Sequence, residues 1–513
     1  MNLEKILVLF VVVGASLLDA CPANADSGQP NIVVIYADDH AQHAISAYGS
    51  RINKTPNIDR LAAKGTRFNQ SFVANSICGP SRATLLTGLH SHANGQTSNR
   101  VQFRDDLPTF AKTLQSNGYA TAVIGKWHLS TRPKGFDYWA LKKGSFFNAE
   151  FETTDGVEKS TGHVSDTITD RALNWISQHK DRPFLVWISH SAAHRTWEPP
   201  IRHLNKYATE TIPEPKTLFA DYQGKNVGAL TAQMRISRDF FPAYDLKLPV
   251  TGEGVLDRAA SQQLEKMTPK QREAWHAAFG PRNDKFAELN LTGDELTRWN
   301  YQRYIKNYLR KVDGLDDSLG KIQLYLRENN LDKKTIVIHT ADQGFFLGDH
   351  GWYDKRWMYE GSLRTPLIIH WPGVTQPDAV NESIVQNIDM APTFLQMAGL
   401  DYPESMHGKS LVPLLKGNTP DDWRDSIYYH YQMKEPNSRT SHLVAKHYGI
   451  RTAKHKFIFF YELDSWELYD LENDPDETRN QYSNSEFAPL VSELKQQLKQ
   501  LRSEFGDTTG RSF

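Results

Sequence analysis

The strongest constraint on the fold is a set of five apolar, β-branched runs separated by segments with helical spacing. Such unbroken apolar runs are typical of parallel strands that are buried on both faces of a sheet. Their alternation with helices predicts an α/β domain that is doubly wound around a mostly parallel central sheet. In such a domain the ligand site lies at the carboxyl ends of the strands. The five runs cover residues 31–39, 120–128, 183–190, 335–344 and 365–373.

Two further segments differ from this pattern. Residues 202–291 separate the third run from a long helical pattern, and we interpret them as an insertion over the site. Inside the insertion, "TPKQ" combines a capping residue, a proline in the first turn and a later glutamine, which predicts a helix start at Thr268. From about Asn418, short strand-like pieces precede a charged helix. They predict a smaller α+β domain with an antiparallel sheet over residues 418–513, so that the large α/β domain spans residues 26–417.

A long helical pattern follows the insertion and begins at a second capping sequence, Thr292 to Glu295. It carries apolar and aromatic side chains at helical spacing, Tyr304 and Tyr308 among them. We expect this stripe to pack in the core.

The first residues of the chain are typical of an export signal. A lysine precedes the apolar run "ILVLFVVVGASLL", which is shorter than the roughly 20 residues of a membrane-spanning helix. Small residues before Asp26 favour cleavage after Ala25, so that residues 1–25 form the signal peptide. A lipoprotein box that ends at Cys21 is the alternative. The protein is therefore predicted to be exported without a stable membrane span, as a periplasmic or secreted protein or, in the alternative case, as a surface lipoprotein.

The charge balance excludes partners that are recruited by a global electrostatic field. Lys and Arg number 59 and Asp and Glu number 60, which leaves a formal net charge of -1. We expect no nucleic-acid partner, because nonspecific binding to nucleic acid relies on an excess of positive charge. Affinity for an anionic ligand must come from a local pocket.

Acidic and amide side chains end two of the predicted strands. Asp38 and Asp39 end the first run, and Asp342 and Gln343 lie at the end of the fourth. At one sheet edge the three carboxylates would repel one another unless a cation bound, and oxygen-only ligands suit Ca²⁺ or Mg²⁺. Each pair alone is also compatible with an ordinary strand-ending turn. Together, at two strands of one predicted sheet, they favour a metal site.

The same edge is predicted to receive several cationic side chains. Lys126 and His128 end the second run, His194 follows the third, and Lys355 follows the fourth. Taken singly, each is more often a solvated surface group or a hydrogen-bonded structural one. Grouped opposite a metal, they predict a pocket for a small tetrahedral anion, which stabilises the charge that develops on a transferred sulfuryl or phosphoryl group.

Cys78 is one of only two cysteines and precedes a Gly-Pro-Ser turn where a helix is expected to begin. If Cys21 leaves with the signal peptide, no disulfide can form. Three roles are open on the residues alone: a buried inert thiol, a thiolate activated at a helix N-terminus, and the precursor of a modified residue.

The motif C-x-P-S-R, here "CGPSRATLLTG" from Cys78 to Gly88, resembles the signature of the type I, formylglycine-dependent sulfatases of the alkaline phosphatase superfamily. Further blocks are similar to those of this family, in the same order, over nearly the whole mature chain. They include "NIVVIYADD", "GYATAVIGKWH", "HTADQGFFLGDHGWYDKRWMYEG" and "ELYDLENDPDETRN". The chain resembles bacterial carbohydrate sulfatases in particular, which implies an alkaline phosphatase-like fold and hydrolysis of sulfuric esters.

The resemblance implies a modified residue and a metal ion. Cys78 would be converted to 3-oxoalanine (formylglycine) by a formylglycine-generating maturation enzyme, and the hydrated aldehyde would be the nucleophile that attacks sulfur. Gly79 within the motif leaves open which maturation system acts. Gln343 stands where the family commonly has asparagine, and its amide oxygen still offers a ligand. The ligands of one Ca²⁺ ion would be Asp38, Asp39, Cys78 in its modified form, Asp342 and Gln343.

The resemblance also implies a role for each residue of the cationic pocket. Lys126 and Lys355 would neutralise the sulfate oxygens, and His194 would protonate or hydrogen-bond the leaving oxygen. His128 would take the proton of the second hydroxyl of the hydrated aldehyde, which expels sulfate. Arg82 would bind the hydrated aldehyde.

The export signal and the resemblance predict a sulfated oligosaccharide or polysaccharide as substrate, either a marine polysaccharide or a glycosaminoglycan. Candidate sugar contacts, chosen because cationic and aromatic side chains suit sulfated sugars, are Arg195, Trp197, His350 and Trp352. Packing of the insertion against the core is the alternative role for these four side chains. The alternative function is a phosphodiesterase or phosphonate monoester hydrolase of the same superfamily, because it would use much the same metal site. A noncatalytic sulfated-glycan-binding protein would not need Cys78.

Overall fold

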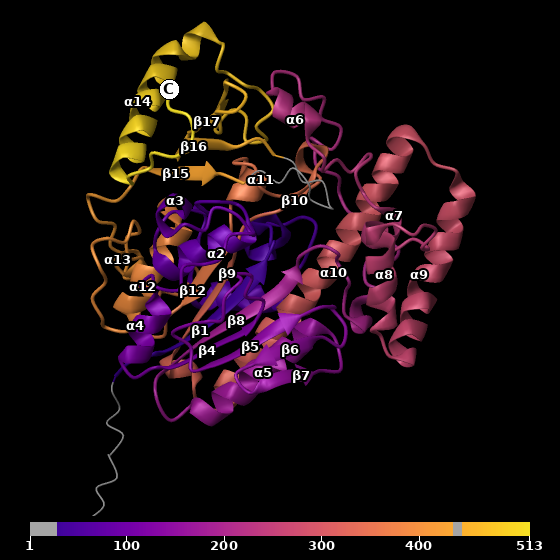
Figure 1. Ribbon diagram of the computed structural model, residues 1–513, viewed down its shortest axis with the longest axis horizontal. Coiled ribbons are helices and arrows are strands. Elements are labelled where there is room, and N and C mark those ends of the chain that lie inside the picture. Colours follow the sequence, from indigo (N-terminus) through magenta and orange to yellow (C-terminus); the bar gives the residue numbers. More distant parts are fainter. Residues whose placement is uncertain (1–27, 434–443) are drawn as a thin grey trace, which may run out of the picture.

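A sheet of ten strands forms the centre of the computed structural model, which describes residues 28–433 and 444–513 (Figure 1). The five central strands, β9-β1-β8-β4-β5, run parallel to one another. Strands at both sides of this block pair antiparallel, which makes the whole sheet mixed. In order across the sheet, the strands are β13 (Ala379–Asn381), β2 (Thr66–Phe68), β12 (Leu367–His370), β9 (Thr335–Ala341), β1 (Asn31–Asp38), β8 (Phe184–Ala193), β4 (Ala120–Gly125), β5 (Tyr138–Lys143), β6 (Glu150–Thr153) and β7 (Gly156–Lys159).

Four of the five apolar runs form parallel strands, and the fifth does not. Strand β12 lies antiparallel to both of its neighbours, β9 and β2, so the expectation of a parallel strand there is wrong. A parallel neighbour requires a long crossover connection, usually a helix. The segment between β9 and β12 has no long helix: it contains two short strands, β10 (Phe346–Leu347) and β11 (Tyr353–Asp354), a 3-10 turn at Asp349–Gly351 and the single turn of α11 (Glu360–Leu363).

Helices cover both faces of the sheet, which confirms the doubly wound fold class. Three helices cover one face of the sheet and pack against the side chains of β1 and β8 on that face. They are α1 (Pro56–Lys64), α5 (Val164–His179) and α10 (Gly293–Glu328). The opposite face is covered by α2 (Cys78–Thr87), α4 (Phe110–Ser116) and α12 (Met390–Met397). Two small parts complete the large domain: the helices α3 (Ser91–Asn94) and α13 (Val412–Leu415), and the paired strands β3 (Ser71–Phe72) and β14 (Val385–Gln386).

The segment at residues 202–291 contains four α-helices, and those after residue 241 stand at the flank of the domain, beside α10 (Figure 1). The predicted helix start is present: the Thr268 hydroxyl accepts from the N–H of Gln271 (3.3 Å), and the Gln271 side chain accepts from the N–H of Thr268 (2.8 Å). Its helices are α6 (Val227–Thr231), α7 (Pro242–Leu246), α8 (Val255–Glu265) and α9 (Pro269–Leu289).

A separate antiparallel sheet follows near the C-terminus and is covered by the terminal helix, as the predicted fold class requires. It contacts the large domain at the chain segment just before Cys78. The N–H of His430 donates to the carbonyl of Ala74 (3.1 Å), and the hydroxyl of Tyr429 accepts from the N–H of Ser76 (3.3 Å). The elements are β15 (Ser426–Tyr431), β16 (His447–Thr452), β17 (His455–Phe460), β18 (Ser465–Asp470) and α14 (Ala488–Glu504).

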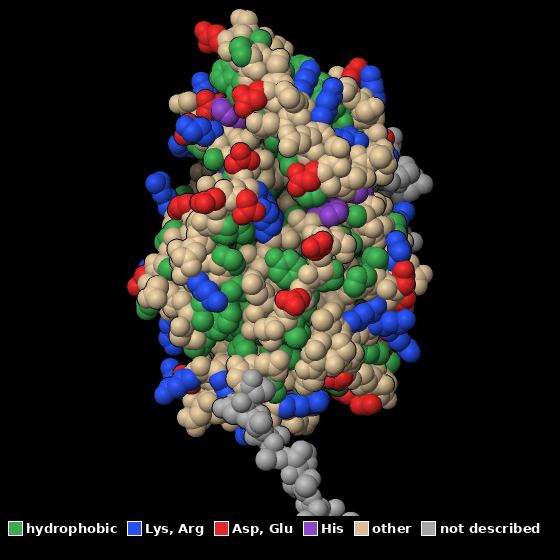
Figure 2. Space-filling model, turned by 90° about the vertical axis from the view of Figure 1, so that its left-hand side faces the viewer, with side chains coloured by type: hydrophobic (Ala, Val, Ile, Leu, Met, Phe, Trp, Pro, Cys, Tyr) green, Lys and Arg blue, Asp and Glu red, His purple; other side chains and the backbone are tan. Residues whose placement is uncertain are grey.

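Positive and negative side chains are interspersed over the surface. Figure 2 shows this mixture on one face, in agreement with the near-zero net charge. Within the described residues, every helix is too short or too polar to cross a bilayer. The predicted signal peptide at residues 1–25 and the lipoprotein alternative at Cys21 lie outside the described residues.

We predict that Gly125→Ala destabilises the sheet edge. Gly125 ends β4 with a φ of 115°, and an added Cβ would lie 2.0 Å from the carbonyl oxygen of Ser189. The clash adds about 1–3 kcal/mol to the roughly 1–2 kcal/mol cost of a side chain at positive φ. Gly118→Ala is the matched control, because Gly118 also has a positive φ but open space around it. Urea denaturation measures both losses, and equal losses would contradict the predicted clash.

Candidate active site

The first acidic pair lies where β1 ends. Asp38 is the last residue of β1, and Asp39 follows with a φ of 63°; both side chains are fully buried. Tyr308 of α10 fixes this bend, because its hydroxyl donates to the carbonyl of Asp39 (2.7 Å) and accepts from the N–H of Ala41 (2.9 Å). Helix α10 therefore does more than pack in the core: it holds two carboxylates at the sheet edge.

The second pair, Asp342 and Gln343, follows β9, which is the direct neighbour of β1. The N–H of Asp39 donates to Asp342 Oδ1 (3.0 Å), and the Gln343 amide nitrogen donates to Asp39 Oδ1. The amide oxygen Oε1 of Gln343 is buried and has no hydrogen-bond partner within the described residues. The tertiary structure thus brings both pairs together and leaves one buried oxygen ready for a ligand.

Cys78 is the first residue of α2 and lies at the centre of this group. Its sulfur is 3.5 Å from Asp38 Oδ1, 3.4 Å from Gln343 Nε2 and 3.5 Å from Lys355 Nζ. Burial raises the pKa of the Cys78 thiol to about 12, although Lys126 and Lys355 act in the opposite direction. The thiol is therefore protonated at neutral pH, which argues against an activated thiolate.

Arg82, four residues further along α2, ties the elements together through its guanidinium group. It donates to Asp342 Oδ2 from two nitrogens (3.2 and 3.0 Å), to the carbonyl of Lys126 (2.8 Å) and to the hydroxyl of Ser189 (2.7 Å). Ser189 was not identified from the sequence. Its only signal there is its place as the first polar residue after the apolar start of the strand.

Two ammonium groups neutralise the acidic pair of β1. Lys126 Nζ lies 2.5 Å from Asp38 Oδ2, and Lys355 Nζ lies 2.5 and 2.6 Å from the two oxygens of Asp39. Burial alone would raise the pKa of Asp38, but Lys126 holds it well below its usual range. Burial, with a further contribution from Asp38, raises the pKa of Asp342 to about 7. Burial and the neighbouring charge of Asp38 thus disfavour the ionised form of Asp342, although Arg82 acts in the opposite direction.

Two histidines border the acidic cluster. His194 Nε2 is 3.9 Å from Asp39 Oδ2, and its carbonyl accepts from Lys311 Nζ (2.7 Å). Burial, and then the charge of Lys126, lowers the pKa of His128 to about 3 and lowers that of His194 well below its usual range. Both imidazoles are therefore neutral at neutral pH, and a neutral imidazole offers one nitrogen that donates and one that accepts a hydrogen bond.

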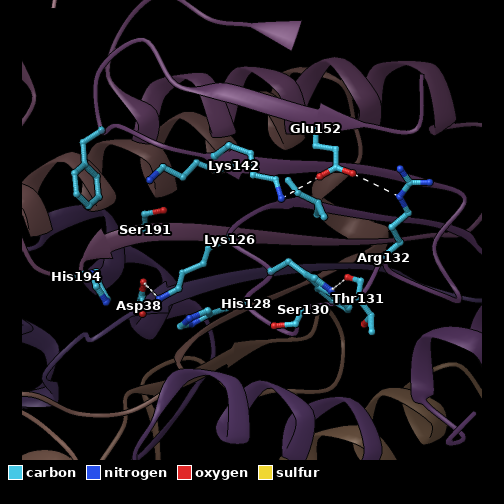
Figure 3. A pocket seen from close by; sticks show the side chains of 14 residues that line it. Asp38, Lys126, His128, Ser130, Thr131, Arg132, Lys142, Glu152, Ser191 and His194 are labelled. Atoms are coloured by element: carbon cyan, nitrogen blue, oxygen red, sulfur yellow. Dashed lines mark hydrogen bonds and ion pairs between the residues drawn. The ribbon is translucent and has the colours of Figure 1, made fainter. Parts of the chain in front are cut away.

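A cavity of about 560 Å³ opens onto these groups, and Figure 3 shows it from close by. Asp38, Lys126, His128 and His194 lie on one side of it. The outer part is lined mainly by residues that follow β4, by β5 and by β6. No residue of the segment 202–291 lines this cavity, so the expected insertion over the site stands beside it instead.

The four candidate sugar contacts do not line this cavity. Arg195 donates to both carboxylate oxygens of a buried aspartate, Asp245 (2.6 Å each). Trp197 is fully buried among aromatic rings that include Tyr304 and Tyr353. His350 and Trp352 are buried with their ring centroids 5.3 Å apart, and Trp352 stacks on Trp357 (5.2 Å) and Tyr222 (5.4 Å). These positions favour the packing role that the sequence left as the alternative.

The acidic cluster fits one hard divalent cation. Ligand atoms of Asp38, Asp39, Cys78 and Asp342 all lie within 4.8 Å of one another, and the unpartnered oxygen of Gln343 adds a fifth. Oxygen-rich sets of this kind are typical of Ca²⁺. Beside such an ion, the two lysines and two neutral histidines form a site for a tetrahedral anion with groups able to accept a proton.

The comparisons with known families agree with this chemistry. The profile of the family described as Sulfatase matches residues 30–400, and that of the family described as N-sulphoglucosamine sulphohydrolase, C-terminal, matches residues 348–504.

Individual relatives match over nearly their whole length. An N-acetylglucosamine-6-O-sulfatase of Bacteroides thetaiotaomicron is 39% identical over 97% of this chain and 91% of its own. A solved structure in complex with its substrate D-glucosamine-2-N,6-O-disulfate has a TM-score of 0.91 at 38% identity and covers 94% of this chain and 99% of its own. An arylsulfatase of Clostridium perfringens is 24% identical over 94% of this chain and 97% of its own.

We predict that Tyr308→Phe lowers activity through the position of the acidic pair. The change leaves the buried carbonyl of Asp39 and N–H of Ala41 without this partner, which costs about 1–3 kcal/mol. Tyr304→Phe is the matched control, because its buried hydroxyl donates to the carbonyl of Phe346 instead (2.7 Å). Thermal unfolding measures the loss of stability in each variant, and ester hydrolysis measures the loss of activity. Equal losses of activity in both variants would show that Tyr308 has no special role.

Proposed function

Because the chain belongs to the sulfatase family and is a sulfuric ester hydrolase, we propose that it removes the 6-O-sulfate of N-acetylated or N-sulfated glucosamine. The observation that carries this proposal is the likeness, over nearly the full chain, to a relative and a solved structure whose substrates are 6-O-sulfated glucosamines. The cavity next to Lys126 and His194 supports it, since about 560 Å³ suits a ligand of the size of a sugar residue.

We assign the acidic cluster to one Ca²⁺ ion, held by Asp38, Asp39, Asp342, Gln343 and residue 78. When bound, the ion supplies a Lewis acid that withdraws charge from the reacting oxygens. The close grouping of the ligand atoms of Asp38, Asp39, Cys78 and Asp342 and the unpartnered Gln343 oxygen support this assignment.

We further propose that Cys78 is a precursor, converted to formylglycine before the protein acts. The hydrated aldehyde would supply one hydroxyl as nucleophile and a second whose proton can be removed. The place of residue 78 at the centre of the acidic cluster, next to Asp38, Gln343 and Lys355, supports this role.

The remaining residues act on the sulfate and on protons. Lys126 and Lys355 are permanent cations beside Cys78 and neutralise the sulfate oxygens. His194 hydrogen-bonds the leaving sugar oxygen, and neutral His128 takes the proton of the second hydroxyl. Arg82 is held by four hydrogen bonds and fixes the position of Asp342 relative to α2.

Release of sulfate from defined sugars tests the substrate. We expect the protein, coexpressed with a maturation enzyme, to release sulfate from N-acetylglucosamine 6-sulfate and from glucosamine-2-N,6-O-disulfate. Galactose 6-sulfate and N-acetylglucosamine 3-sulfate are the controls for the sugar and the position. Hydrolysis of phosphonate monoesters instead, with the aldehyde confirmed by mass spectrometry, would favour the alternative function.

Replacement of residue 78 tests the modified nucleophile. Cys78→Ser has one hydroxyl and no second one for His128 to deprotonate, so we expect no multiple turnover. Cys78→Ala should bind the sugar and release no sulfate. Sustained turnover by the serine variant, measured as sulfate released per enzyme molecule, would refute this scheme.

Calcium binding is testable without activity. After treatment with a chelator, we expect added Ca²⁺ to raise Tm, because a ligand at 100 times its Kd stabilises the native state by about 2.7 kcal/mol. Asp342→Asn should lose most of this shift, since it removes a carboxylate ligand. A wild-type Tm that does not respond to Ca²⁺ argues against the assignment, and a response to Mg²⁺ alone would reassign the metal.

A further inference from the structure

Lys142, in β5, is the cation of the cavity whose charge no carboxylate balances. Lys126 pairs with Asp38, whereas Lys143 and Arg132 both pair with Glu152 (3.0 and 3.5 Å). Among the described residues, no carboxylate lies within 4.0 Å of the Lys142 ammonium group, which donates to the carbonyl of Gly144. Figure 3 shows Lys142 across the cavity from Lys126 and His128, above Ser191.

On balance, the surroundings of Lys142 disfavour its positive charge. Its Nζ lies 4.6 Å from the centre of the Phe146 ring, a cation–π contact that favours the charged form, but a second ammonium group shares this ring, because Lys311 Nζ lies 3.3 Å from its centre. Burial, and then the positive charge of Lys126, lowers the pKa of Lys142 to about 8; Glu198 and Asp38 act in the opposite direction from a greater distance than an ion pair. An anion bound beside Lys142 would relieve this penalty.

We propose that Lys142 binds a second anionic group of the substrate, one that is not cleaved, so that the site prefers a 6-O-sulfated glucosamine that carries another negative charge. This inference rests on the proposed function. Lys126 and Lys355 already lie beside Cys78 and serve the sulfate that reacts, whereas Lys142 lies on the other wall of the cavity. A sugar between the two walls would present the reacting sulfate to one and a second substituent to the other.

Two sources of the second anion share this chemistry: an N-sulfate on the same sugar and the carboxylate of a neighbouring uronic acid. Three substrates distinguish them. N-acetylglucosamine 6-sulfate has one anion, glucosamine-2-N,6-O-disulfate adds the N-sulfate, and a disaccharide of uronic acid and N-acetylglucosamine 6-sulfate adds the carboxylate.

The test is the ratio of kcat/KM for each doubly charged substrate to that for N-acetylglucosamine 6-sulfate. We expect Lys142→Met to lower one of these ratios about tenfold, which corresponds to about 1.4 kcal/mol. The substrate whose ratio falls identifies the anion. Lys142→Arg should restore the ratio, and Lys143→Met, which also removes one positive charge from the cavity, should leave it unchanged.

The pH dependence provides a second readout. In the wild type the affected ratio should fall as the pH rises above about 8, because the lowered pKa leaves Lys142 uncharged there. In Lys142→Arg the ratio should stay constant over this range, since a guanidinium remains charged.

Binding to Cys78→Ala keeps this test separate from that of the proposed function. Calorimetry compares Cys78→Ala with Cys78→Ala/Lys142→Met, and we expect the second substitution to weaken binding of a doubly charged sugar about tenfold. If the wild type cleaves neither sugar, the proposed function fails, and the binding comparison still decides the role of Lys142. Unchanged ratios and unchanged binding in the Lys142→Met variants would overturn the inference.

Discussion

The mutual repulsion of three fully buried carboxylates is the constraint on which the rest of the site depends. Asp38, Asp39 and Asp342 meet because β1 and β9 are neighbours and end at the same edge. Burial of like charges at this distance is costly unless cations compensate them. Lys126 and Lys355, which come from separate loops, compensate the first two, while Arg82 compensates the third. The pairing of these charges thus fixes the positions of several chain segments relative to one another.

Structures outside the sheet keep these segments in place. Helix α10 reaches the site through Tyr308 at Asp39 and through Lys311 at the carbonyl of His194. The C-terminal sheet reaches it through Tyr429, whose hydroxyl contacts the backbone on both sides of the site: it accepts from the N–H of Ser76 and donates to the carbonyl of Arg356 (2.7 Å). The smaller sheet therefore acts as a support for the segments that carry Cys78 and Lys355. The site thus lies at the edge of the large sheet but is also supported by the C-terminal sheet.

Much of the architecture could be predicted because it depends on local patterns. Buried parallel strands have unbroken apolar sequences, and the polar residues that end them mark the sheet edge. The direction of β12 could not be predicted, since an antiparallel strand buried in a mixed sheet has the same apolar sequence as a parallel one. Trp197 and Trp352 were equally ambiguous, because an aromatic side chain beside a site residue suits both a sugar and the core. Ser189 had no signal beyond its own polarity.

By itself the sequence determined the fold class, the order of the strands along the chain and the residue types at their ends, because hydrophobic burial and turn chemistry are encoded over short distances. It also carried the motif around Cys78. Only the tertiary structure decided which cations are paired and which are left over, since Lys142 and Lys143 are adjacent in sequence and point to different partners. It likewise decided that the helices at residues 202–291 stand beside the cavity. Charge pairing and the packing of insertions depend on side chains far apart in the chain, which no local pattern records.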